Sequence, residues 1–364
     1  MPFEPIFVPD AMREAVSDAA WLEAMLAAEV ALARAQARVG VIPAEAAHEV
    51  AEACRSERFA VEAIAREARA AGNPIPALVA AANQEWVHHG ATSQDIVDSA
   101  AMLVARRALD LIGGDLEGVA AACARLAEEH RETPMQARTL MQQAEPTTFG
   151  LKAAGWLDAV LDAREALAST ELAAQLGGAA GTLASMGDHG PEVLREFARA
   201  LGLAEPTLPW HAQRGRVAEL GASLAIAAGV LGKVALDVEL LAQTEVGEVA
   251  SGSGESSSMP HKRNPVEAVR ARACARRVQA AAGLLLRGVS DHEHERAAGA
   301  WHAEWAPLSD ALACTGGGAA AAREMLERLE VRPDRMRANS SGDPGQHVAA
   351  AARLVDRALE RYRG

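Results

Sequence analysis

Hydrophobic residues recur along most of this chain at alternating steps of three and four positions, the spacing of one face of an α-helix. One series, from Ile96 to His130, would span about 50 Å as a helix. Three more stretches, Thr147 to Ala174, Val266 to Val289 and Trp301 to Leu329, carry the same pattern. The clearest is a heptad seam at Val217, Leu220, Leu224, Ala227, Leu231, Val234, Val238 and Leu241. The pattern predicts an all-α fold, an elongated bundle of five long helices, and no convincing strand.

Shorter helical stretches precede the bundle and one follows it. Ala20 to Arg38 predicts an amphipathic helix closed by Gly40, and Val348 to Tyr362 predicts a terminal helix. A long seam cannot be covered by a compact small domain, so we expect other subunits to complete the bundle. The predicted parts are a small helical N-terminal domain at 1–95, a central long-helix bundle at 96–337 and a short tail at 338–364.

Composition narrows the class of protein. Half of the 364 residues are apolar but only 3% are aromatic, which suits close-packed helices rich in Ala, Leu and Val. The net charge of -13 argues against a nucleic-acid surface. The four cysteines lack metal-ligand spacing, and we see neither a signal peptide nor an apolar run of membrane length. We therefore expect a cytoplasmic protein that binds neither nucleic acid nor membrane.

One segment, residues 251–267, combines a flexible loop with chemically active side chains. Residues 251–258, which are Gly and Ser apart from Glu255, precede Met-Pro-His-Lys-Arg-Asn-Pro, after which a helix begins at Val266. A serine hydroxyl here would lie near Lys262 and Asn264, groups that can hold the enediolate formed when a proton leaves a carbon next to a carboxylate. The alternative is an ordinary Ser/Gly-rich surface loop before a basic helix start.

The run Ser-Ser-Ser-Met-Pro-His-Lys-Arg-Asn-Pro at 256–265 resembles the signature loop of the fumarase/aspartase superfamily. The resemblance extends over residues 15–340 and implies that Ser256 is the catalytic base, with Lys262 and Asn264 beside it. It also implies an enzyme without cofactor or metal, and a homotetramer whose active sites each draw on three subunits. Which of Ser256, Ser257 and Ser258 acts stays open.

Residues 88–95, His-His-Gly-Ala-Thr-Ser-Gln-Asp, precede the long helix that starts near Ile96. On residue types alone, Ser93 or Asp95 could simply cap that helix. Under the resemblance the segment is similar to a second signature region, so His88, Thr92 and Ser93 become expected ligands of substrate carboxylates.

A third signature-like region, residues 138–150, indicates the type of leaving group. The resemblance implies that Arg138 and Gln142 bind substrate, while Leu140 stands where amine-expelling lyases of the superfamily carry a histidine that acts as general acid. An expelled amine needs a proton, whereas a carboxylate, with a pKa of about 4, leaves unaided at neutral pH. Leu140 therefore indicates that a weakly basic group is lost or added.

That chemistry fits lactone closure by a carboxylate of the substrate. Residues 139–152, 177–183, 209–216 and 292–305 resemble bacterial carboxymuconate cycloisomerases, which implies a role in protocatechuate breakdown, the β-ketoadipate pathway. One alternative is a lyase that expels another weak base, such as nitrite from a nitrosuccinate. A second is a non-catalytic helical scaffold. Adenylosuccinate lyase is disfavoured, since the acid at position 140 is missing.

Two arginines complete the candidate site. Arg214 and Arg296 are candidate anion ligands, because a tricarboxylate needs several cations, and surface salt bridges are the alternative. His292 and His294 are two residues apart and do not share a helix face, so we expect no metal site there.

Two features depart from the superfamily pattern. Glu255 replaces a glycine beside the expected base, and Ser340 to Pro344 leads almost at once to the terminal helix, as though a small third domain had been excised. Both put the usual activity and substrate in question.

Overall fold

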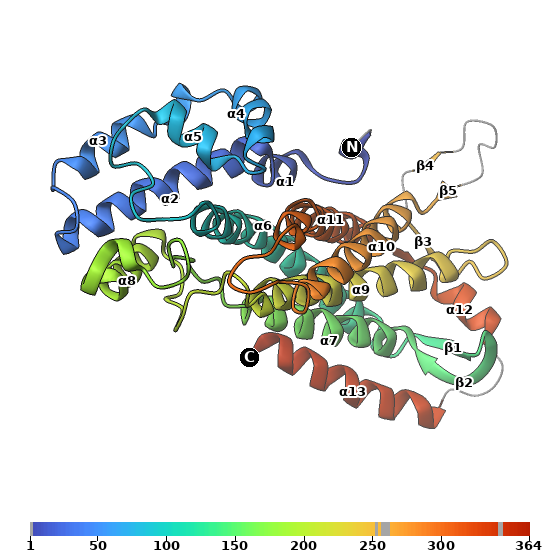
Figure 1. Cartoon of the computed structure of the whole chain (residues 1–364). Helices are drawn as coiled ribbons and strands as arrows, with labels where there is room; N and C mark the ends of the chain where they lie inside the picture. Colours follow the sequence, from blue (N-terminus) through green and yellow to red (C-terminus); the bar gives the residue numbers. More distant parts are fainter. Residues whose placement is uncertain (1–2, 252–253, 256–262, 341–344) are drawn as a thin grey trace.

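The computed structural model describes residues 3–251, 254–255, 263–340 and 345–364, and its chain forms an elongated helical molecule (Figure 1). Five long helices make the bundle, in which α10 packs against α9 and α11, α11 against α6, and α7 against α6 and α9. Their bounds are α6 Ser93–Glu129, α7 Phe149–Ala168, α9 Gly215–Leu241, α10 Val266–Arg287 and α11 Ala300–Glu327. The predicted all-α bundle is confirmed.

Further helices lie around the bundle. Within the described residues, no helix is both long and apolar enough to cross a membrane. Of the helices outside the bundle, α2 Asp18–Val39 is as long as α10, and the shorter ones are α1 Asp10–Ala15, α3 Ala46–Ala53, α4 Val61–Glu67, α5 Ile75–Ala82, α8 Gly190–Leu201, α12 Pro333–Asn339 and α13 Gly345–Arg363, with 3-10 turns at Glu4–Ile6, Ser56–Arg58, Ala68–Ala70 and Ala184–His189.

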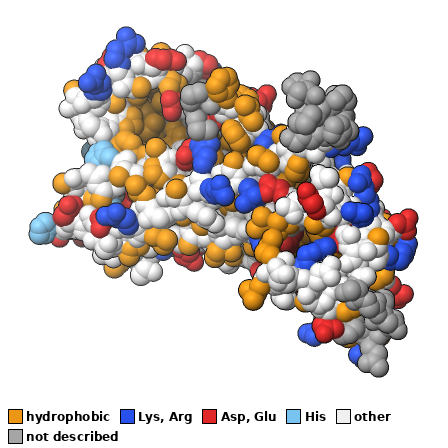
Figure 2. Space-filling model, turned by 90° about the vertical axis from the view of Figure 1, so that its right-hand side faces the viewer, with side chains coloured by type: hydrophobic (Ala, Val, Ile, Leu, Met, Phe, Trp, Pro, Cys, Tyr) orange, Lys and Arg blue, Asp and Glu red, His pale blue; other side chains and the backbone are white. Residues whose placement is uncertain are grey.

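The heptad seam of α9 is buried inside this one chain. Its eight positions are at most 5% exposed, because α10, α11 and α7 cover them. The seam therefore needs no second subunit, contrary to our expectation. Other apolar side chains of α9 and α10 do face outward, among them Ile226, Val269 and Leu284. On the face in Figure 2, orange hydrophobic side chains lie among the charged ones and line a hollow.

Close packing of α11 depends on its three consecutive glycines. A side chain at Gly317 would collide with the backbone carbonyl of Phe7, and one at Gly316 would collide with Met12. The missing side chains thus let the N-terminal segment lie directly on the bundle.

The prediction of no strand is wrong. β1 Pro134–Thr139 and β2 Gln142–Thr148 form an antiparallel hairpin, and α7 starts at Phe149 instead of Thr147. The turn between them, Leu140-Met141, has positive φ at both residues, the geometry of a two-residue type I′ hairpin. Sequence reasoning missed it because the turn lacks the Asn-Gly signal that such hairpins usually carry. Four two-residue strands also form two antiparallel pairs in the described residues: β3 Val249–Ala250 with β6 Glu330–Val331, and β4 Gly254–Glu255 with β5 Arg263–Asn264, which contains a site candidate.

Candidate functional site

The start of α6 is held by one buried carboxylate. Asp95 accepts the backbone N–H of Thr92 at 2.9 Å in a capping box, so Thr92 is the N-cap, where Ser93 or Asp95 had been considered. Asp95 also accepts from the backbone N–H groups of Gly177 and Gly178, and His211 Nε2 lies 2.6 Å from its Oδ1. One side chain thereby joins three segments that are distant in the sequence.

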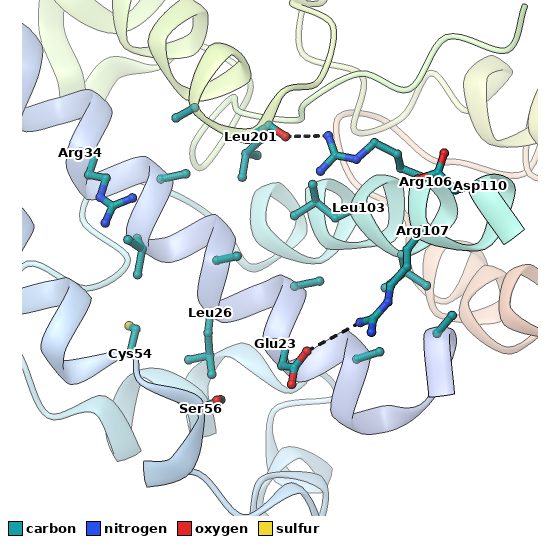
Figure 3. A pocket seen from close by; sticks show the side chains of 18 residues that line it. Glu23, Leu26, Arg34, Cys54, Ser56, Leu103, Arg106, Arg107, Asp110 and Leu201 are labelled. Carbon is teal, nitrogen blue, oxygen red and sulfur yellow. Dashed lines mark hydrogen bonds and ion pairs between the residues drawn. The ribbon is translucent and has the colours of Figure 1, made fainter. Parts of the chain in front are cut away.

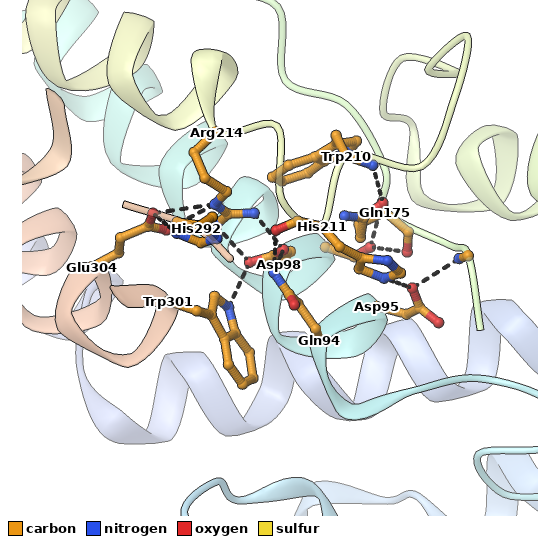
Figure 4. A network of polar contacts seen from close by, with 12 residues as sticks. Gln94, Asp95, Asp98, Gln175, Trp210, His211, Arg214, His292, Trp301 and Glu304 are labelled. Carbon is orange, nitrogen blue, oxygen red and sulfur yellow. Dashed lines mark hydrogen bonds and ion pairs between the residues drawn. The ribbon is translucent and has the colours of Figure 1, made fainter. Parts of the chain in front are cut away.

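Arg214 belongs to a network of buried polar side chains that Gln94 links to His211, the partner of Asp95 (Figure 4). Its guanidinium is 2% exposed and donates to Asp98 at 2.7 and 3.0 Å and to Glu304 at 2.6 Å. Burial lowers the pKa of Arg214, but the charges and hydrogen bonds of Asp98 and Glu304 outweigh it and raise the pKa. We had two predictions for Arg214, a ligand of substrate anions or a partner in a surface salt bridge. In the structure it is instead a buried cation bound to two carboxylates of the same chain.

The same network takes up His292. Its Nε2 lies 3.2 Å from Glu304 Oε1, while Trp301 Nε1 donates to Asp98 at 3.0 Å. The described residues contain no group of three or more His, Cys, Asp or Glu that could hold a metal. Four acidic and basic side chains stabilise one another in this network and connect α6, α11 and the segment before α9. They are Asp98, Arg214, His292 and Glu304.

Four predicted ligands lie around the start of α6, and we call His88, Thr92, Ser93 and Arg296 the α6-start cluster. Each is partly exposed. Arg296 donates to the carbonyls of Gly178 and Ala179 at 3.3 and 2.8 Å. A Cβ at Gly178 would lie 3.0 Å from the Gly90 carbonyl, so the two loops are in direct contact. The structure therefore brings these four candidates into one region.

Three other predicted residues, Arg138, Gln142 and Asn264, lie at the opposite end of the bundle and form the hairpin-end group. Arg138 donates to Glu248 from both terminal nitrogens, at 3.0 and 2.6 Å, and these hydrogen bonds raise its pKa. Gln142 is exposed on β2, and Asn264 is half-buried on β5. Leu140, at the hairpin tip, is 96% exposed.

The length of α6 separates the two sets. Its 37 residues span about 55 Å at the usual rise of 1.5 Å per residue. The α6-start cluster contacts its first turns, whereas the hairpin follows its last residue (Figure 1). Ser256 and Lys262 lie outside the described residues. A single chain therefore does not gather the described candidates into one site.

A groove of about 710 Å³ between α2, α6 and α8 is unrelated to these residues (Figure 3). Arg106 donates to the Leu201 carbonyl at 2.8 Å, and Arg107 lies 3.8 Å from Glu23. None of the described site candidates lines it.

Sequence reasoning considered Asp95 only as a cap, and it missed four other buried acids that organise these regions, Glu29, Asp98, Glu248 and Glu304. A signal existed for one of them. Glu29 and Gln36 are seven residues apart and therefore share a helix face, and they interrupt an apolar stretch of Ala and Leu in α2. A charge on the apolar face of a helix indicates a buried polar contact.

Comparison with known proteins identifies the family. The family model described as Lyase matches residues 8–280. The nitrosuccinate lyase of Streptomyces davaonensis is 49% identical over 96% of this chain and 79% of its own length. The 3-carboxy-cis,cis-muconate cycloisomerase of Bradyrhizobium diazoefficiens is 44% identical over 95% and 80%. The chain belongs to the Lyase family, which is part of the fumarase/aspartase superfamily, and is an enzyme of that superfamily.

Solved structures agree with this assignment. The 3-carboxy-cis,cis-muconate lactonizing enzyme of Pseudomonas putida superposes with a TM-score of 0.88 at 37% identity, over 99% of this chain and 87% of that one. A fumarate lyase of Mesorhizobium sp. BNC1 gives a TM-score of 0.84 at 38% identity, over 98% and 87%. The superfamily resemblance found in the signature loop is confirmed.

Proposed function

We propose that the protein is a 3-carboxy-cis,cis-muconate cycloisomerase. A carboxylate of the substrate adds to a conjugated double bond to close a lactone, and a proton is delivered to the carbon next to another carboxylate. The observation that carries the type of chemistry, addition or loss of a weakly basic group, is Leu140, which offers no proton donor at the exposed tip of the hairpin. A carboxylate oxygen needs none, because it is a weak base. Several relatives named as cycloisomerases support it.

Ser256 is the proposed proton carrier, with Lys262 and Asn264 supplying positive charge and an amide donor to the enediolate. Arg138, Gln142 and the α6-start cluster are proposed to bind the carboxylates. Arg214 is left out of this set, since Asp98 and Glu304 already take its donors. In the backbone pairing of β4 with β5, Glu255 stands opposite Arg263.

We further propose a homotetramer with shared active sites, and a cytoplasmic location remains our prediction. Two observations support shared sites: the candidates lie at opposite ends of α6, and apolar side chains such as Ile226 and Leu284 face outward on α9 and α10. Mixing two inactive variants tests this. If S256A and H88N subunits are unfolded and reassembled together, hybrid tetramers should regain activity, whereas sites built within single chains would stay inactive.

A second candidate is a nitrosuccinate lyase, favoured by the 49% identical relative of that name. Nitrite is also a weakly basic leaving group, so Leu140 suits this reaction equally, with Ser256 removing the proton. The two reactions differ in product, a lactone in one case and fumarate with nitrite in the other.

One pair of assays separates the candidates. Incubation with 3-carboxy-cis,cis-muconate should remove the diene absorbance, and incubation with nitrosuccinate would release nitrite if the second candidate is right. The substrate with the larger kcat/KM decides between them. No turnover of the muconate, even at high concentrations of folded enzyme, would overturn the first proposal.

The base is tested by matched serine variants. Ser256→Ala should abolish turnover while the assembly stays intact, and Ser257→Ala and Ser258→Ala should retain it. The rate loss expected from removing a proton carrier is about 10²- to 10⁴-fold. If a different serine gave the large loss, the base would be reassigned.

A further inference from the structure

Glu29 is a fully buried carboxylate on α2 that contacts a single residue twice. Its Oε1 lies 2.7 Å from His88 Nδ1, and its Oε2 accepts the backbone N–H of the same residue at 2.9 Å. A buried carboxylate is costly unless it is paired and hydrogen-bonded, and His88 supplies both. These two contacts of Glu29 involve neither Asp95 nor Asp98.

The backbone of His88 is held in an uncommon conformation by this contact. Its φ of 63° lies in the left-handed region, which a histidine rarely adopts and which costs free energy. Gln36, seven residues after Glu29 on α2, donates to the carbonyl of His89 at 2.6 Å. Two side chains on one face of α2 thus hold the 88–89 turn at fixed points.

The other ring nitrogen of His88 points away from this anchor. The side chain is 19% exposed, and in the described part of the chain Nε2 has no hydrogen-bond partner. With Nδ1 facing a carboxylate, Nε2 is the nitrogen that can meet a substrate. A hydrogen bond between one ring nitrogen and a carboxylate sets the tautomer and the orientation of a histidine.

The charges around His88 favour its protonated form. Burial lowers its pKa, but the hydrogen bond and charge of Glu29 and the charge of Asp95 together raise the pKa above its ordinary 6.5. The charge of Glu29 also acts on Cys54: burial, together with that charge, raises the pKa of Cys54 to about 12, so the thiol stays neutral. The charge of Arg58 lowers the pKa of Cys54 and so opposes these two effects.

We propose that Glu29 is a positioning residue of the active site, which holds His88 as an imidazolium with its Nε2–H directed at a carboxylate of the substrate. The inference rests on the proposed function, in which His88 binds a substrate carboxylate. A charged donor binds a carboxylate about twice as strongly as a neutral one. Glu29 touches no substrate and acts only through His88.

Glu29→Gln tests the proposal, since it keeps the shape and a possible hydrogen bond but removes the charge. At pH 7.5 we expect KM to rise about tenfold with a smaller change in kcat, because a charge-assisted contact in the bound state is lost. At about pH 5.5 the difference from wild type should be smaller, since falling pH protonates His88 in the variant as well, although at a lower pH than in wild type. A KM equal to that of wild type at pH 7.5, or a defect independent of pH, overturns the proposal.

A titration without substrate separates this proposal from the proposed reaction. In protein labelled at histidine Cε1, the NMR signal missing from His88→Asn identifies His88 among the 11 histidines. It should titrate above 6.5 in wild type and lower in Glu29→Gln. If it does so while neither substrate is turned over, the positioning role stands and the proposed reaction fails. A wild-type His88 that titrates at or below 6.5 overturns the role, even if Glu29→Gln does not fold.

Two controls distinguish positioning from support of the loop. Gln36→Leu removes the neutral anchor of the same turn, so any change in KM should be the same at about pH 5.5 and about pH 7.5, near the two limits of histidine titration. His88→Asn suits the left-handed backbone and removes the charge.

The pH dependence of stability gives a further test. The Glu29–His88 pair stabilises the fold below pH 6.5, and this contribution is lost as the pH rises through the raised pKa of His88. The His88→Asn variant should lack that pH dependence.

Discussion

The two ends of α6 use charged residues in opposite ways. At its start, Asp98, Arg214 and Glu304 are at most 4% exposed and bind one another. At the hairpin end Glu248 is buried, but its partner Arg138 is 28% exposed, and Leu140 and Met141 project into solvent. Charged side chains that pair inside one chain stabilise its fold and use their donors and acceptors on one another. Exposed groups at a hairpin tip, in contrast, can contact substrate or another subunit.

The largest effect is expected at the buried end. Arg214→Met leaves two carboxylates buried without their cation, which should lower the free energy of unfolding by about 3–5 kcal/mol. Urea unfolding at fixed protein concentration measures it. Arg195→Met is the control, because Arg195 forms an exposed pair with Glu192 and its loss should matter far less. Equal effects of the two variants would remove the distinction between the ends.

A smaller effect is expected where the hairpin joins the bundle. Glu248 accepts from Arg138 and also from Asn339 Nδ2 at 3.0 Å. Glu248→Gln should cost about 1.5–3 kcal/mol, since hydrogen bonds to a charged group are lost but Arg138 remains partly hydrated. Urea unfolding and hydrogen exchange of β1 and β2 measure the change. If Glu248→Gln lowered the free energy of unfolding as much as Arg214→Met does, hydration of Arg138 would not reduce the cost of losing its partner, and the contrast between the two ends would fail.

The smallest change is expected at the hairpin tip, and it is a gain. Leu140→Asn combined with Met141→Gly places at both positive-φ positions the residues that a type I′ turn prefers, so stability should rise by about 0.5–1 kcal/mol. Thermal unfolding measures it. Leu208→Asn removes another exposed leucine without positive φ and should give no such gain. If the double variant instead weakened assembly or turnover, the tip would contact another subunit or the substrate.

The long helices could be predicted from the sequence because burial of one face leaves a periodic record. The start of α6 near Ile96, the seam of α9 and the end of α2 at Gly40 all follow from local rules of periodicity and capping. The hairpin could not be predicted from the sequence, since its turn, Leu140-Met141, carries no turn signal. Its strands, which contain Arg138 and Gln142, have only six and seven residues.

The candidate site divides in the same manner. Residue types and the signature loops indicated His88, Thr92, Ser93 and Arg296, and the fold brings their segments together. The role of Arg214 could not be predicted, because its partners Asp98 and Glu304 are far away in the sequence. The local sequence of an arginine does not show whether it is free or enclosed by two acids. Glu29 was missed because its partner His88 lies 59 residues away.

The order of residues alone therefore determined the helical class, the superfamily and the chemistry available in its loops, since each depends on short runs of neighbouring side chains. Only the tertiary structure decided which charges are enclosed and which face outward, and that the candidates lie at both ends of a helix of 37 residues. The physical reason is that the cost of a buried charge depends on partners far away in the chain, which spacing along the sequence does not record.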